Sequence, residues 1–255
     1  MSKLKQGTGR SEKEEDYRCG ESKSERLQKL LSAYGAASRR GAEKLILEGR
    51  VQINGVTAEL GQSAFPGQDN ITVDGVPLES KVRPVYIMLN KPCGYITTRN
   101  DERGRKTVME LVSGVPGYIY PVGRLDKDSE GLLLFTNDGE FANTVLHPSF
   151  NNQKTYEVKV RGDAQKAEEL LQQPVKIDNY TVYASKVVLL EAGKDGGTLE
   201  ISVTEGRNRQ IRKMCAACGT SVITLKRKSV GRLELGDLET GQWRYLTEEE
   251  VLSFG

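Results

Sequence analysis

Two helical patterns and one hairpin pattern lie near the start of the chain. Apolar residues recur every three or four positions at 27–31 and at 42–46, the spacing of helix faces that pack on a core. Positions 51–53 then alternate into Asn54-Gly55, the strongest short-range signal for a hairpin turn. Each helix is bounded by a serine that can cap it and a glycine that can end it, Ser24 with Gly35 and Ser38 with Gly49. We predict a compact helix, turn, helix, hairpin module.

From Val85 onward, short β-rich runs alternate with helical patterns. Strands are predicted at 86–89, 131–136, 156–160, 182–190, 198–203 and 221–226, and helices at 107–111, 140–146, 165–171 and 210–217. The order of these elements is irregular. We therefore predict an α+β fold whose larger domain is a mixed, mainly antiparallel β-sheet with flanking helices.

Composition divides the chain into four segments. Residues 1–24 carry many charges of both signs and almost no apolar side chains, so we predict a disordered tail. The helical and hairpin module occupies 25–79. A polar stretch that contains Pro84, at 80–84, is the predicted linker. The β-rich remainder, 85–255, forms the larger domain.

Charge and hydropathy narrow the classes of protein. The chain has 255 residues with 37 Lys and Arg against 35 Asp and Glu, so binding must depend on where charge gathers. No apolar run approaches the roughly 20 residues of a membrane span, and the amino end lacks the apolar core of a signal peptide. We expect a cytoplasmic protein with no membrane partner, whose four cysteines stay reduced.

The sequence lacks the motifs that several kinds of chemistry require. The glycine-rich nucleotide-binding fingerprints and a double CxxC pattern are both missing, so we expect no nucleotide cofactor and no metal. His147 is the only histidine and precedes a proline, which favours a helix end over a catalytic role. Cys215 and Cys218 fall within a helical pattern and are expected to pack in a core.

Basic residues gather in two places. In the N-terminal module they are Arg26, Lys29, Arg39, Arg40, Lys44 and Arg50. Two of these fall in the first turn of the second helix, where free N–H groups and the helix dipole attract phosphate, although a merely solvated helix face is the alternative. In the larger domain they are Arg207, Arg209, Arg212 and Lys213, around a predicted helix start. This density is typical of a phosphate-binding surface.

A loop with several carboxylates precedes the apolar strand at 131–136. Asp126 lies in a glycine-flanked loop held by that strand, which suits a positioned nucleophile. On this reasoning alone, Asp128 and Glu130 are equally available. A carboxylate pair for glycoside hydrolysis fits poorly, because we expect the side chains of Asp126 and Asp128 to point in opposite directions.

Two resemblances follow from the motifs. The stretch from about 25 to 73 resembles the alpha-L RNA-binding motif of ribosomal proteins and RNA-modifying enzymes. The larger domain resembles the RsuA/RluB family of ribosomal RNA pseudouridine synthases, most of all its large-subunit RluB branch. The motifs occur in the family's order: Leu89-Asn90-Lys91-Pro92, Gly123-Arg124-Leu125-Asp126, Lys154-Thr155-Tyr156, the block at 205–214 and Gly241-Gln242-Trp243-Arg244. Ser129 replaces the family's usual threonine and keeps its hydroxyl.

The resemblance implies roles for individual residues. Asp126 matches the family's nucleophile, and Arg212 matches the basic residue that pairs with this aspartate and keeps it charged. Tyr156 matches the tyrosine that stacks on the extruded base. Arg124 is expected to fill the gap left by the flipped nucleotide. The reaction implied is the isomerisation of uridine to pseudouridine, without a cofactor.

We therefore predict a monomeric enzyme that acts on ribosomal RNA of the large subunit, free or within a subunit precursor. Contacts to RNA are assigned to Arg124, Arg26, Lys29, Arg39, Arg40, Lys44, Arg207, Arg209 and Lys213. Two alternatives stay open. One is the same reaction on small-subunit RNA, and the other is a non-catalytic ribosome-assembly factor that uses the same basic surfaces.

Overall fold

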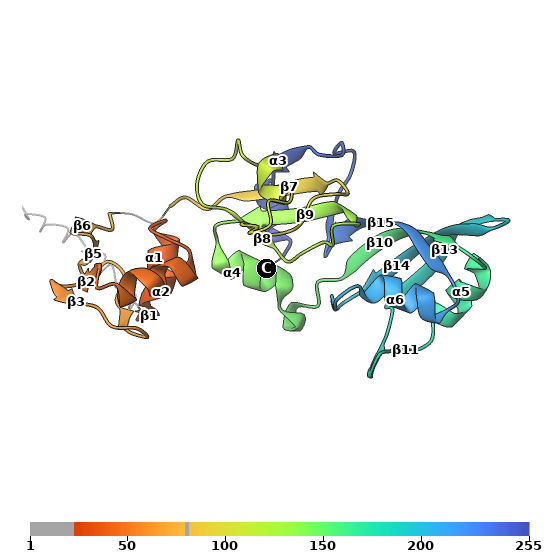
Figure 1. The fold of residues 1–255 in the computed structure, drawn as a ribbon, viewed down its shortest axis with the longest axis horizontal. Coiled ribbons are helices and arrows are strands. Elements are labelled where there is room, and N and C mark those ends of the chain that lie inside the picture. Colours follow the sequence, from red (N-terminus) through yellow and green to blue (C-terminus); the bar gives the residue numbers. More distant parts are fainter. Residues whose placement is uncertain (1–22, 80–81, 255) are drawn as a thin grey trace, which may run out of the picture. The chain divides into compact units, whose positions relative to one another are not determined.

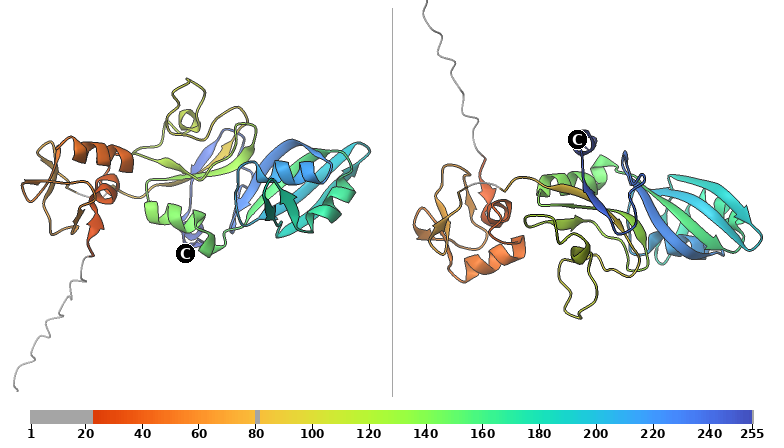
Figure 2. Two further views of the ribbon diagram at one scale, coloured as in Figure 1. Left: turned by 60° about the horizontal axis from the view of Figure 1, so that its bottom comes forward. Right: turned by 90° about the horizontal axis from the view of Figure 1, so that it is seen from above.

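The chain divides into two compact units, residues 1–79 and residues 80–255. The computed structural model describes residues 23–79 and 82–254. Figure 1 traces both units in chain order, and Figure 2 shows them from two further sides. The disordered tail predicted at 1–24 lies outside the described residues except for its last two. Each unit has an apolar core of its own.

The N-terminal unit contains both predicted helices. Its elements are β1 (Glu25–Arg26), α1 (Leu27–Ala33), α2 (Arg39–Leu47), β2 (Val51–Ile53), β3 (Val56–Thr57), β4 (Ser63–Ala64), β5 (Ile71–Val73) and β6 (Val76–Pro77). The predicted Ser38 cap of α2 is confirmed, because its side chain accepts a hydrogen bond from Gly41 N at 3.0 Å. The predicted Ser24 cap of α1 is wrong. Pairing of β1 with β4 keeps the chain extended as far as Arg26, which occupies the cap position.

The hairpin and one helix face build the core of this unit. β2 and β3 pair antiparallel around Asn54 and Gly55, whose φ angles of +53° and +81° fit the mirror-image turn that this dipeptide favours. Leu27, Leu30 and Leu31 of α1 are fully buried and pack against apolar residues of α2, β2 and β5. The predicted hairpin is thereby confirmed.

The C-terminal unit is one large sheet with helices on both sides. Its elements are β7 (Tyr86–Lys91), α3 (Val108–Leu111), β8 (Tyr120–Val122), β9 (Glu130–Thr136), α4 (Gly139–Leu146), η1 (Pro148–Phe150), β10 (Lys154–Arg161), α5 (Ala164–Leu171), β11 (Val175–Ile177), β12 (Tyr180–Val182), β13 (Lys186–Gly193), β14 (Gly196–Val203), α6 (Gln210–Ala217), β15 (Ser221–Val230), β16 (Leu233–Glu234), β17 (Trp243–Tyr245) and α7 (Glu248–Leu252). The strand order is β13-β14-β10-β15-β9-β7-β17, with β8 on β9 and β16 on β15.

Two halves of the sheet meet where β15 runs parallel to β9. The parallel contact is short, with Lys226 opposite Glu130 and Arg227 opposite Gly131, whereas the other described pairings of the sheet are antiparallel. Gly131 has a φ of +101°, and a Cβ there would lie 2.3 Å from the carbonyl oxygen of Arg227. Glycine is therefore required for the two strands to approach this closely. The prediction of a mixed, mainly antiparallel sheet is confirmed.

The central strands are buried on both faces. Successive side chains of β7 and β9 point to opposite faces, so Leu89 and Phe135 pack in one cluster with residues of α3, α5 and α6. Met88 and Leu134 pack in a second cluster with residues of α4. Both views of Figure 2 agree with α5 and α6 lying on one face of the half formed by β10, β13, β14 and β15. This packing fixes β9, and with it the loop that precedes it.

The other predicted elements differ mainly at their ends. Helix 210–217 has the predicted bounds, and His147 ends α4 as predicted. The single strand predicted at 182–190 is wrong. β12 ends at Val182 and pairs with β11 outside the main sheet, and the chain then turns through Ser185 before β13 begins.

Candidate active site

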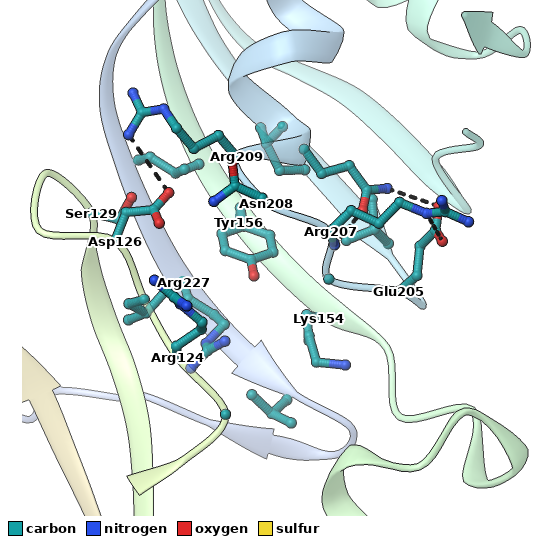
Figure 3. A pocket seen from close by; sticks show the side chains of 18 of the residues that line it. Arg124, Asp126, Ser129, Lys154, Tyr156, Glu205, Arg207, Asn208, Arg209 and Arg227 are labelled. Carbon is teal, nitrogen blue, oxygen red and sulfur yellow. Dashed lines mark hydrogen bonds and ion pairs between the residues drawn. The ribbon is translucent and has the colours of Figure 1, made fainter. Parts of the chain in front are cut away.

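A pocket opens at the junction of the two sheet halves. Its volume is about 330 Å³, and its lining comes from the loop at 122–129, the start of β10, the turn at 205–209 and β15. Of the residues named from the sequence, Arg124, Asp126, Tyr156, Arg207 and Arg209 all line it (Figure 3). The structure thus brings together motifs that are up to about eighty positions apart in the chain.

Hydrogen bonds to its main chain hold the loop that carries Asp126. Thr97 Oγ1 donates to the carbonyl oxygen of Leu125 at 2.7 Å and accepts from the amide of the same residue at 3.2 Å. The amide of Gly94 donates to the carbonyl oxygen of Lys127 at 2.8 Å. The Asp126 side chain is 22% exposed. Its carboxylate can therefore be reached from the pocket although its backbone is fixed.

A buried lysine supports the same loop from the sheet side. Lys91, the last residue of β7, is fully buried, and its Nζ donates to the carbonyl oxygens of Asp126 at 3.1 Å, Ser129 at 2.7 Å and Pro92 at 3.0 Å. Burial lowers the pKa of Lys91 to about 8, although nearby negative charges oppose this change. The sequence analysis named Lys91 only as part of the Leu89-Asn90-Lys91-Pro92 motif. The signal that could have indicated its buried role is a single lysine that directly continues an apolar strand.

One guanidinium contacts both acidic side chains of the loop. Arg209 donates to the two carboxylate oxygens of Asp128 at 3.0 Å each, and its Nη1 lies 3.7 Å from Asp126 Oδ2. Hydrogen bonding from Arg209 holds the pKa of Asp128 below its usual value, in spite of partial burial. The expectation that the side chains of Asp126 and Asp128 point in opposite directions is wrong. The backbone turns here, with the amide of Ser129 donating to the carbonyl oxygen of Asp126 at 3.1 Å, and both carboxylates face Arg209.

Arg212 supports the backbone of this loop. Its Nη2 donates to the carbonyl oxygen of Asp128 at 2.6 Å, and its Nε lies 3.4 Å from Asp128 Oδ2. The resemblance led us to expect Arg212 to pair with Asp126, but the ion pair to that carboxylate comes from Arg209. Arg209 and Arg212 are three positions apart around the start of α6, so both face the same loop. A catalytic role for Arg212 stays a prediction.

Tyr156 places an aromatic ring in the same pocket. It lies on β10 between β14 and β15 and is 8% exposed. Figure 3 shows its ring in the middle of the pocket, between Asp126 and Arg207. An aromatic face beside a reachable carboxylate suits a planar base stacked near the atom that reacts.

The remaining basic residues of the 205–213 block have partners within the protein. Arg207 forms an ion pair with Glu205 at 2.8 Å, and its guanidinium lies 4.3 Å from the centre of the Tyr180 ring. Lys213 forms an ion pair with Asp178. These contacts orient the side chains around the pocket mouth and on the first turns of α6. Whether each touches RNA stays a prediction.

Arg39 and Arg40 differ from the other basic residues of the N-terminal unit. Both are exposed in the first turn of α2, where a helix attracts anions. The four other basic residues named in this unit are engaged within it: Lys29 with Glu25 at 2.9 Å, Lys44 with Glu48 at 3.6 Å, Arg50 with Asp74 at 2.6 Å, and Arg26 with the main-chain carbonyl of Gly61. Phosphate binding by this unit stays a prediction, and the exposed start of α2 is the position that favours it most.

The cysteine pair is structural. Cys215 and Cys218 are buried in the core, as expected, and burial raises the pKa of the Cys215 thiol to about 12. A thiol so hard to deprotonate is a poor nucleophile and metal ligand. Over residues 23–79 and 82–254, no cluster of His, Cys, Asp and Glu is arranged to hold a metal ion. The same residues contain no helix long and apolar enough to cross a membrane.

Comparisons with known proteins fit this site. Residues 85–217 match the family described as RNA pseudouridylate synthase, and residues 25–63 match the S4 domain. The chain is 45% identical over 89% of its length to ribosomal large subunit pseudouridine synthase B of Bacillus subtilis, and covers 94% of it. An uncharacterized RNA pseudouridine synthase of Aquifex aeolicus is 42% identical over 89% of this chain and 92% of its own. A crystal structure of a pseudouridylate synthase superposes with a TM-score of 0.64 at 27% identity, covering 90% of this chain and 99% of that one.

The mixed sheet, the pocket at its junction and these matches define an RNA-modifying isomerase. The chain belongs to the RNA pseudouridylate synthase family and carries an S4 domain in its N-terminal unit. The predicted family, fold class and reaction, uridine to pseudouridine in RNA, are thereby confirmed. Family membership, and not the geometry of Asp126 and Asp128, argues against glycoside hydrolysis.

Proposed function

We propose that this enzyme isomerises one uridine of large-subunit ribosomal RNA and that Asp126 is its nucleophile. The observation that carries the proposal is the Asp126 carboxylate, partly exposed in a pocket that also holds the Tyr156 ring and the Arg209 guanidinium. The choice of RNA is supported by the relative from Bacillus subtilis, whose name places its activity on the large subunit.

The reaction rearranges atoms within one nucleotide. The bond from C1′ to N1 breaks, the base turns, and a bond from C1′ to C5 forms. C5 loses a proton and N1 gains one, so substrate and product have the same composition and no oxidant or reductant is consumed. Asp126 attacks either C1′ or the pyrimidine ring and is released when the new bond is complete. Both routes need a charged carboxylate held beside the target nucleotide, at C1′ of the ribose or at the ring.

Three neighbours of Asp126 have distinct tasks in this proposal. Arg209 supplies the positive charge nearest to the Asp126 carboxylate, at 3.7 Å. Tyr156 offers its ring to the detached base, which must turn without leaving the pocket. Arg212 is a positioning residue, because its contacts are to Asp128 and hold the loop.

The target uridine must leave the RNA stack to reach this pocket. Arg124 lies on the exposed rim beside Asp126 and is suited to fill the gap left in the RNA. Affinity comes from phosphate contacts by the basic residues around the pocket mouth and by the N-terminal unit, above all Arg39 and Arg40.

Tritium release tests the nucleophile. Ribosomal RNA tritiated at C5 of its uridines should release tritium to water when incubated with this protein, since C5 loses its hydrogen. Asp126→Asn should abolish the release, whereas Asp237→Asn, at an exposed position of the C-terminal unit, should release it at the wild-type rate. Full turnover by Asp126→Asn would show that another group attacks.

Mapping of cellular RNA tests the substrate. Deletion of the gene should remove one pseudouridine from large-subunit RNA. Loss of a site from small-subunit RNA would move the proposal to the other subunit. If deletion left every pseudouridine in place, the non-catalytic assembly factor would be favoured, because its basic surfaces would serve without any chemistry.

A further inference from the structure

One side of the pocket carries three cations, of which the mechanism above uses only the one at the rim, Arg124. Arg124, Lys154 and Arg227 all line the pocket. Figure 3 draws them on the side toward which the Tyr156 hydroxyl points. Among the described residues, no carboxylate lies within ion-pair distance of any of the three. The two carboxylates of the pocket lining are engaged elsewhere, Asp126 with Arg209 and Glu205 with Arg207.

Arg227 is the most unusual of these cations. It lies on β15 at the parallel junction and is 4% exposed. Its Nε donates to the carbonyl oxygen of Leu132 at 2.8 Å, which fixes the guanidinium plane. A charge removed from water without a charged partner is costly, so such groups are retained where they bind something. Arg227 itself lines the pocket, so the N–H groups that Leu132 does not use are available to a ligand there.

Lys154 strengthens the same positive region. It is half-buried at the start of β10, and its Nζ donates to the carbonyl oxygen of Asn152 at 3.2 Å. Its pKa is lowered, first by burial and then by the positive charge of Arg227. The two cations are therefore close enough to repel each other. An anion placed between them would relieve that repulsion.

We propose that Arg227 and Lys154 form a phosphate subsite, which binds the backbone phosphate of the flipped uridine, with Arg124 adding positive charge at the rim. The inference rests on the proposed function, because the proposed function identifies a uridine as the nucleotide that enters this pocket. A planar guanidinium matches two phosphate oxygens at once, and an ammonium serves as a point charge beside it.

Such a subsite has a task during isomerisation. When the bond between C1′ and N1 is broken, the base is no longer held by its ribose. A phosphate bound by Arg227 and Lys154 keeps that ribose beside Asp126 while the base turns against Tyr156. Phosphate contacts elsewhere on the RNA would not restrain this one ribose as closely.

Binding of small nucleotides tests the subsite without knowledge of the RNA target. The probes are uridine 5′-monophosphate, uridine 3′-monophosphate and uridine, each titrated against the whole protein by ligand-observed NMR. The wild type should bind one of the monophosphates at least about tenfold more tightly than uridine. Arg227→Gln should reduce this ratio to near one and leave the affinity for uridine unchanged. Arg227→Lys should keep part of the preference.

Two further variants serve as comparisons. Lys228→Gln removes the neighbouring cation of β15, which pairs with Glu157 at 3.9 Å, and should keep the wild-type ratio. Lys154→Gln should lower the ratio as Arg227→Gln does. Circular dichroism shows whether Arg227→Gln is folded, and if it is not, the result for Lys154→Gln decides the question.

The outcomes separate this inference from the proposed function. An equal loss of affinity for uridine and its monophosphates in Arg227→Gln would mean that the arginine reads the base or ribose, and would overturn the subsite. A wild type without preference for either monophosphate would also overturn it, even if tritium release proceeds normally. The third outcome is a wild type that releases no tritium from ribosomal RNA but prefers a monophosphate, with the preference lost in Arg227→Gln. This result would refute the reaction proposed for that RNA and would support the phosphate contact.

Discussion

Arg212 Nη2 donates to the main-chain carbonyl of Asp128 at 2.6 Å, so this arginine is tied to the backbone two residues beyond Asp126. Arg209, by contrast, reaches the carboxylates of both Asp126 and Asp128. One arginine of the 205–213 block therefore fixes the loop, and the other supplies charge to it. The two tasks predict different kinetic defects.

Arg212→Lys should slow the chemical step more than it weakens RNA binding. A lysine cannot make the same fixed contacts to the loop, and a small displacement of a reacting group can lower the rate by about 10²-fold. Single-turnover tritium release measures the chemical step, and filter binding measures affinity. Lys166→Gln, an exposed position on α5, is the matched control. A variant that binds RNA poorly but reacts normally once bound would show that Arg212 contacts RNA and does not position the loop.

Lys91 predicts a pH dependence of stability. Burial lowers its pKa in the folded protein to about 8, while an exposed lysine in the unfolded chain titrates near 10.4. Between these values the unfolded chain binds more protons, so the contribution of this group to the free energy of unfolding rises with pH. The slope is up to roughly 1.4 kcal/mol per pH unit.

Comparison with Lys91→Met isolates this effect. The variant loses the three hydrogen bonds from Nζ at every pH, but it has no proton to lose at this position. The difference in unfolding free energy between wild type and variant should therefore be larger at pH 9.5 than at pH 7.5, as measured by urea denaturation. An equal difference at both pH values would mean that Lys91 keeps an ordinary pKa when folded.

Local patterns predicted the elements that local interactions decide. The helix at 210–217, the Ser38 cap and the turn at Asn54 each depend on residues within a few positions, and all three are present. The Ser24 cap failed because a strand pairing with residues 63–64, distant in sequence, decides where α1 begins. No signal close to Ser24 indicates that pairing.

The site was predictable in its residues but not in its contacts. The motifs brought Asp126 and Tyr156 forward, and both line one pocket. Which arginine meets Asp126 depends on how α6 is placed against the loop, which no spacing within 205–213 reveals. The buried role of Lys91 depends on the pairing of β7 with β9, and that of Arg227 depends on the junction of β15 with β9. The junction of β15 with β9 joins segments almost a hundred positions apart, and only the folded chain shows it.

Gly131→Ala should destabilise the C-terminal unit by roughly 2–4 kcal/mol, because a Cβ would be forced into the backbone of β15 in a strained conformation. The clash would be with the carbonyl oxygen of Arg227 at 2.3 Å, and φ is +101°. Gly114→Ala, where an added Cβ would meet only the Trp243 ring at 4.0 Å beyond its chain neighbours, should change stability by less than about 0.5 kcal/mol. Thermal unfolding of both variants measures the difference, and equal melting temperatures would contradict the close approach of the two strands.

Replacing Arg39 and Arg40 together by glutamine should weaken binding to ribosomal RNA and reduce its dependence on salt. Each phosphate contact releases counterions, so the slope of log affinity against log salt concentration should fall by about one to two. The RNA should still be isomerised at the wild-type rate under saturating, single-turnover conditions, because both residues belong to the unit at 1–79 and the pocket belongs to the other. Lys194→Gln, at an exposed position in the turn between β13 and β14, should leave the slope unchanged. If the double variant kept the wild-type slope, the start of α2 would be only a solvated helix face.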